Sequence, residues 1–135
     1  MKKTNYKELI SEIKALTDGI DHPIANYANV SAAIRNAMDA INWAGFYLLE
    51  GDTLILGPFQ GNPACVYIAP EQGVCGAAVK ERRTMIVPDV HEFPGHIACD
   101  AASRSEIVVP MIKDGNHLIG VLDIDSPVPD RFDEN

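Results

Sequence analysis

The chain has 135 residues, 47% of them hydrophobic, and carries a formal net charge of −8 at pH 7. This length predicts a single domain over residues 1–135, with a core large enough to fold without disulfides. The negative charge argues against nucleic acid or an anionic membrane as partner and favours a cationic or zwitterionic ligand. Because the N-terminal segment lacks the apolar core of a signal peptide and no long apolar run occurs, we expect a cytoplasmic protein.

The first forty residues predict two helices. Apolar residues recur at helical spacing from Asn5 to Leu16, with Thr4 as the expected N-cap. Pro23 suits the first turn of a second helix, which we expect to reach about Ile41. The positions expected to face inward are Tyr6, Leu9, Ile10, Ile13 and Leu16, then Ile24, Tyr27, Ala28, Ile34, Met38 and Ile41. We expect the two helices to pair through these stripes.

The following segments predict an antiparallel sheet. From Asn42 the apolar period becomes two, and Gly51-Asp52 separates WAGFYLLE from TLILGPFQ, which indicates a β-hairpin. A short extended run at 65–68, a short helix of small residues in GVCGAAVKE and a strand at 84–87 follow. A second hairpin joins EIVVPMI to HLIGVLDIDS through an Asp-Gly turn resembling type I′. The order of elements predicts an α+β fold, with helices on one face of an antiparallel sheet.

Residues 88–105 stand apart because they contain two prolines, one glycine and no clear periodicity. A connection of this length in a small domain is usually functional or disordered. It contains Cys99, the last of three cysteines after Cys65 and Cys75. Their spacing matches no CxxC motif, which argues against zinc, and we expect no metal or other cofactor. Catalysis, redox sensing and simple burial remain open for the thiols.

Four segments, read together, resemble the free methionine-(R)-sulfoxide reductase family, which is built on the GAF fold. The resemblance extends from about Asn42 to Phe132. It implies a GAF-like antiparallel sheet with N-terminal helices on one face. It also implies a thioredoxin-recycled oxidoreductase that reduces free L-methionine (R)-sulfoxide and leaves peptide-bound sulfoxide alone. The segments are NWAGFYLL, GVCGAAV, DVHEFPGHIACDAASRSEIVVP and IGVLDIDS.

The resemblance also implies residue roles. Cys99 corresponds to the attacking thiol, Cys65 to the thiol that closes a disulfide onto it, and Cys75 to a third cysteine of secondary role. The residues implied to form the substrate pocket are Glu106, Asp123 and Asp125, with Trp43 in its wall. From the residues alone, Cys75 and Trp43 are packing residues by default, and the three acids are by default solvated strand ends.

The chemistry itself explains why thiols and acids would occur together. A thiolate attacks the sulfoxide sulfur while an acid protonates the departing oxygen, and a second thiol converts the resulting sulfenic acid to a disulfide. The acid must keep its proton near neutral pH, which burial beside other carboxyls achieves. Alternation places Asp123 and Asp125 on the same face of a strand.

The negative charge of Asp100 disfavours a thiolate at the neighbouring Cys99. His91 and His96 are candidates to deprotonate or stabilise this thiol, although loop histidines are more often surface residues.

Two other functions share these features: a signalling GAF module that binds a cyclic nucleotide or another small effector, and a redox sensor with a switchable disulfide. Multiple turnover distinguishes an enzyme from the sensor. Family members usually continue past DRFDE into a C-terminal helix, whereas this sequence stops at Asn135. We therefore expect an exposed apolar stripe on the first two helices that a second subunit covers in a homodimer.

Overall fold

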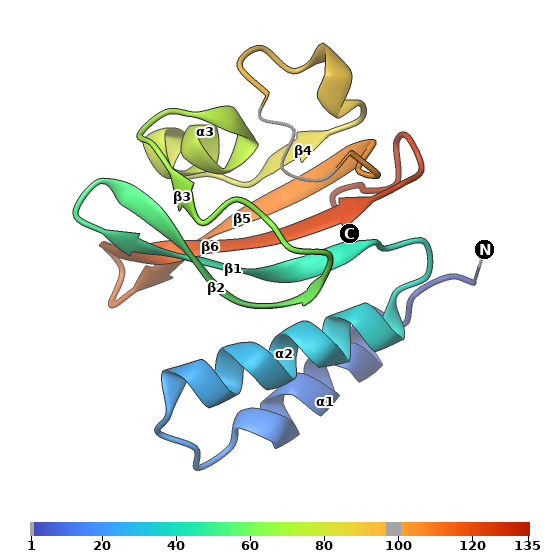
Figure 1. Cartoon of the computed structure of the whole chain (residues 1–135). Coiled ribbons are helices and arrows are strands. Elements are labelled where there is room, and N and C mark those ends of the chain that lie inside the picture. Colours follow the sequence, from blue (N-terminus) through green and yellow to red (C-terminus); the bar gives the residue numbers. More distant parts are fainter. Residues whose placement is uncertain (1, 97–100) are drawn as a thin grey trace.

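The computed structural model describes residues 2–96 and 101–135 and has a six-stranded antiparallel sheet between two helical layers (Figure 1). Helices α1 and α2 cover one face of the sheet, and α3 lies over the other (Figure 1). The strand order is β3-β2-β1-β6-β5-β4. The helices are α1 (Tyr6–Thr17), α2 (Pro23–Ala37), α3 (Gly73–Glu81) and the short 3-10 helix η1 (Val90–Glu92). The strands are β1 (Trp43–Glu50), β2 (Thr53–Gly61), β3 (Tyr67–Ile68), β4 (Met85–Val87), β5 (Ser105–Lys113) and β6 (His117–Ser126). This arrangement confirms the predicted α+β fold class, with the N-terminal helices on one face of an antiparallel sheet.

Both N-terminal helices occur where the periodicity predicts them, but their ends and exposed faces differ from expectation. The N-cap of α1 is Asn5, whose side chain accepts a hydrogen bond from the Glu8 N–H at 3.1 Å, and not Thr4. Helix α2 ends at Ala37, four residues earlier than predicted, because the backbone turns extended at Met38. No helix in the described part of the chain is long and apolar enough to cross a membrane.

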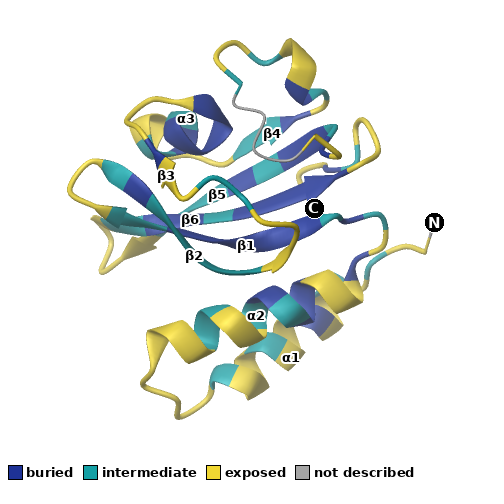
Figure 2. Ribbon diagram, viewed as in Figure 1, coloured by how far each residue is buried: buried dark blue, intermediate teal, exposed yellow. Residues whose placement is uncertain are grey.

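Part of the predicted apolar stripe is uncovered. The sheet buries the middle of α2, whereas the first turn of α2 remains exposed (Figure 2). Helical spacing identifies one face of a helix, but how much of that face is covered depends on where the neighbouring elements end. The residues predicted to face inward that are exposed instead are Ile10, Leu16, Ile24 and Ala28.

The protein has two hydrophobic cores, one on each face of the sheet, and alternate side chains of β1 contribute to each. Trp43 and Tyr47 are buried with residues of α3, while Ala44 joins Ile34 of α2 in the other core. Successive side chains of a strand point to opposite faces, so one strand supplies both cores. The two aromatic residues thus form the floor beneath α3.

The predicted hairpin of β5 and β6 positions the acidic residues. Asp114 and Gly115 have φ values of 54° and 79°, and the Asn116 N–H donates to the Lys113 carbonyl at 3.3 Å. Positive φ at both central residues is the conformation of the predicted type I′ turn. The resulting register places Glu106 opposite Asp125, and Val108 opposite Asp123. The three acids therefore project from adjacent positions toward α3.

Candidate active site

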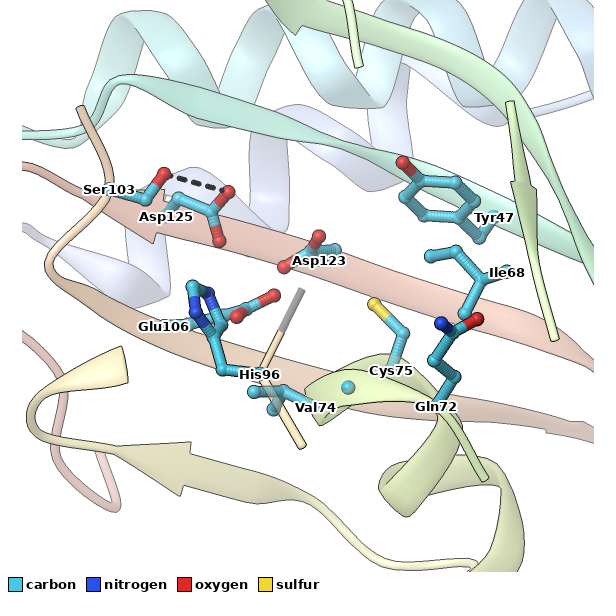
Figure 3. A pocket seen from close by; sticks show the side chains of 11 residues that line it. Tyr47, Ile68, Gln72, Val74, Cys75, His96, Ser103, Glu106, Asp123 and Asp125 are labelled. Carbon is cyan, nitrogen blue, oxygen red and sulfur yellow. Dashed lines mark hydrogen bonds between the residues drawn. The ribbon is translucent and has the colours of Figure 1, made fainter. Parts of the chain in front are cut away.

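A cavity of about 40 Å³ lies between α3 and the face of the sheet formed by β1, β5 and β6 (Figure 3). About 10–15 Å³ is enough to hold one water molecule, so the cavity accommodates a small polar group. Acidic, thiol, imidazole and apolar side chains meet in it. The lining residues are Tyr47, Ile68, Gln72, Gly73, Val74, Cys75, His96, Ser103, Glu106, Asp123 and Asp125.

The three acids implied by the resemblance meet in this cavity and are buried. Asp123 is only 5% exposed, and Glu106 and Asp125 are 8% exposed. Asp125 Oδ2 accepts a hydrogen bond from the Ser103 hydroxyl at 3.2 Å, and Ser103 Oγ accepts one from Asn42 Nδ2 at 3.1 Å. By contrast, Oδ1 of Asp123 and Oδ1 of Asp125 have no hydrogen-bond partner among the described residues. Buried polar atoms are normally paired, so these two oxygens indicate a site for a ligand.

Burial changes the protonation of the acids. It raises the pKa of Asp123 well above its usual range, and the nearby charges of Asp125 and Glu106 add to this effect. Burial also raises the pKa of Asp125, with Glu106 as the main charged neighbour. Carboxylates this close cannot all ionise without large repulsion. The cluster therefore keeps a proton to higher pH than isolated carboxyl groups do, and a carboxyl that keeps its proton can donate it to a bound group.

This protonation predicts an unusual pH dependence of stability. At pH values between the usual aspartate pKa and the raised pKa of Asp123, the Asp123 carboxyl is protonated in the folded state and ionised in the unfolded state. The free energy of unfolding should therefore fall as pH rises through this window, by up to about 1.4 kcal/mol per pH unit for each such group. Urea denaturation from pH 5 to 8 should show a flatter profile for Asp123→Asn. Asp21→Asn, at an exposed position, should follow the wild type, and parallel profiles for all three proteins would refute the assignment.

Cys75 lies in the first turn of α3 and points at the acids (Figure 3). One donor atom from each of Cys75, Glu106 and Asp123 lies within 4.8 Å of the other two. Burial raises the pKa of the Cys75 thiol well above its usual range, and the charges of Asp123 and Glu106 act in the same direction. Cys75 is therefore a protonated thiol in the cavity wall and a poor nucleophile.

Comparisons with known proteins agree with this geometry. The GAF domain model matches residues 22–135. The free methionine-R-sulfoxide reductase of Escherichia coli is 54% identical, over 98% of this chain and 80% of its own length. The structure of fRMsr of Staphylococcus aureus in its reduced form is 58% identical with a TM-score of 0.95, over 99% of this chain and 86% of that chain. Free methionine-R-sulfoxide reductase from Neisseria meningitidis, in complex with its substrate, is 44% identical with a TM-score of 0.91, over 96% and 77% of the two chains.

The chain belongs to the free methionine-R-sulfoxide reductase family. Of the cysteines that this family implies, Cys75 lines the cavity beside the acids, whereas Cys65 does not line it. Cys65, between β2 and β3, takes part in a disulfide, whereas Cys75 is a free thiol. Cys99, expected to be the attacking thiol, lies outside the described residues.

Trp43 does not line the cavity, although the resemblance implied a place in its wall. Its ring stacks on Tyr47 at a centroid distance of 5.9 Å and on Phe59 at 5.1 Å. Its indole N–H donates to the Asn62 carbonyl at 3.1 Å. Trp43 therefore supports the wall from behind, and Tyr47 provides the aromatic surface of the cavity.

Three further side chains contribute to the reductase cavity in ways that sequence reasoning missed or left open. Ser103 holds Asp125 through its hydroxyl, a contact that no motif or spacing in the sequence indicated. Tyr47 also lines the cavity, and its hydroxyl donates to the Cys65 carbonyl at 2.9 Å. His96 lines the cavity near Glu106 (Figure 3), whereas His91 is exposed and does not line it.

Proposed function

We propose that this chain reduces free L-methionine (R)-sulfoxide to methionine. The observation that carries the proposal is the cluster of buried carboxyl groups in the cavity, whose pKa values are raised and two of whose oxygens have no hydrogen-bond partner in the part of the chain that the structure describes. Relatives from Escherichia coli and Saccharomyces cerevisiae are free methionine-R-sulfoxide reductases, which supports the same activity here. The cavity suits the S=O group, whose oxygen accepts a hydrogen bond from a protonated carboxyl.

In the proposed reaction, the sulfur of Cys99 attacks the sulfoxide sulfur while a carboxyl of the cluster protonates the oxygen. The S–O bond of the substrate breaks, the oxygen passes to Cys99 as a sulfenic acid, and methionine leaves. The Cys65 thiol then attacks the sulfenic sulfur, which forms a disulfide and releases water. The substrate gains two electrons, and the pair of thiols supplies them.

A second dithiol must reduce the disulfide before another turnover. We propose thioredoxin as this reductant and a cytoplasmic location, where thiol-reducing systems operate. The participation of Cys65 in a disulfide supports its role as the resolving thiol.

We also propose a homodimer, because Ile10 on α1 and Ile24 on α2 expose 53% and 71% of their surfaces. Sedimentation analysis tests this oligomeric state.

Separated epimers of methionine sulfoxide test the activity. With thioredoxin and its reductase, or with dithiothreitol, the chain should convert the R epimer over many turnovers and leave the S epimer and peptide-bound sulfoxide unchanged. A folded protein that converts neither epimer would contradict the proposal. Oxidation and reduction of the disulfide without substrate turnover would favour a redox sensor.

The two histidines of the 88–105 segment provide a matched pair of variants. Only His96 lines the cavity, and the ring centroids of His91 and His96 lie 6.2 Å apart. His96→Ala should lower kcat/KM for the R epimer by about 10- to 100-fold, in the range of a lost proton-transfer or hydrogen-bonding group. His91→Ala should stay within about twofold, since that side chain does not line the cavity. Equal effects of the two changes on kcat/KM would show that His96 has no specific role in the reaction.

A further inference from the structure

Cys75, Glu106 and Asp123 have the chemistry and spacing of a set of metal ligands. They come from α3, β5 and β6, and their donor atoms lie within 4.8 Å of one another (Figure 3). Zinc binds thiolate sulfur at about 2.3 Å and carboxylate oxygen at about 2.0–2.2 Å, so its ligand atoms lie roughly 3–4 Å apart. Side-chain rotations that move the donor atoms by about 1 Å would therefore bring the three ligands to zinc-binding distances.

A second, independent observation is that one oxygen of the buried Asp123 carboxyl lacks a partner among the described residues. Asp123 is 5% exposed and faces the cavity, yet its Oδ1 has no hydrogen-bond partner among the described residues. A buried carboxylate oxygen is normally hydrogen-bonded or bound to a cation. The thiol beside it selects against hard cations such as Mg²⁺ and favours Zn²⁺.

We propose that the cavity binds one Zn²⁺ ion through Cys75 Sγ and carboxylate oxygens of Glu106 and Asp123, and that the bound ion excludes the sulfoxide. Binding replaces the thiol proton and any carboxyl proton with the metal and releases these protons to solvent, with no oxidation or reduction. A fourth coordination position remains for water. Exclusion follows because the ion takes the oxygens that would otherwise face the sulfoxide, and this part rests on the proposed function.

The disulfide form of the full-length chain gives the clearest test, because Cys75 is then the free thiol and no turnover occurs without reductant. Calorimetry should show one Zn²⁺ per chain and no binding of Mg²⁺. Co²⁺ should give a thiolate-to-metal charge-transfer band that disappears in Cys75→Ser. Asp123→Asn, checked for folding by circular dichroism, should raise the Kd for Zn²⁺ at least about tenfold, while the exposed Asp21→Asn leaves it unchanged.

Three results would overturn the binding site: no uptake of Zn²⁺, uptake of Co²⁺ without the thiolate charge-transfer band, or equal Zn²⁺ affinity in wild type and folded Asp123→Asn. Exclusion is tested separately by adding the R epimer, which should raise the apparent Kd for Zn²⁺ in proportion to its concentration. An unchanged Kd at saturating R epimer would refute exclusion. A chain that reduces sulfoxide without binding Zn²⁺ contradicts only this inference, whereas one that binds Zn²⁺ but reduces neither epimer contradicts only the proposed function.

Discussion

Asp123→Asn should lower kcat/KM for the R epimer by about 10²- to 10⁴-fold, the usual contribution of a positioned general acid. Asparagine has nearly the same size, but it cannot deliver the proton that the sulfoxide oxygen needs on leaving. We expect Asp123 to be the acid in this role, because burial and two neighbouring carboxyls raise its pKa and its Oδ1 has no hydrogen-bond partner within residues 2–96 and 101–135. Steady-state assays with thioredoxin as reductant measure the change.

The controls separate lost chemistry from lost folding. Asp123→Asn removes a buried carboxyl and should leave the unfolding free energy at pH 8 unchanged or higher, whereas an unfolded variant would also lose activity. Asp21→Asn should retain wild-type kcat/KM. Activity of Asp123→Asn within about threefold of wild type would remove Asp123 as the proton donor.

Cys99→Ser should abolish turnover, with a loss of at least about 10³-fold, because no other group in the proposal attacks the sulfoxide sulfur. Cys65→Ser should behave differently. It should still convert about one R epimer per chain in a single turnover and accumulate a sulfenic acid on Cys99, since only the resolving step is lost. Rapid quenching with a sulfenic-acid trap and mass spectrometry would locate the modified cysteine.

The opposite assignment of the two thiols makes a distinct prediction. If Cys65 were the nucleophile, Cys65→Ser would lose the first turnover, and Cys99→Ser would retain it and trap the sulfenic acid on Cys65. Equal loss of the first turnover in both variants, with folding intact, would contradict a division into attacking and resolving thiols.

The sequence by itself was sufficient for features that depend on local backbone geometry. A period of 3.6 located both N-terminal helices, and a period of two located β1 and placed Asp123 and Asp125 on one face. The Asp-Gly pair specified a type I′ turn, because that turn requires positive φ at both central residues. The three cysteines and the segments that resemble the reductases are local sequence features, and they indicated the family.

Only the tertiary structure decided which side chains share the cavity. Cys75 is far in sequence from Asp123, and it meets Glu106 and Asp123 because α3 lies across β5 and β6. The same packing leaves Trp43 behind Tyr47, brings Ser103 onto Asp125 and leaves Ile24 exposed. These contacts join elements that are distant along the chain, and they depend on strand order and on where each helix ends. Periodicity reports the face of an element, whereas the neighbour across that face is set by packing between layers.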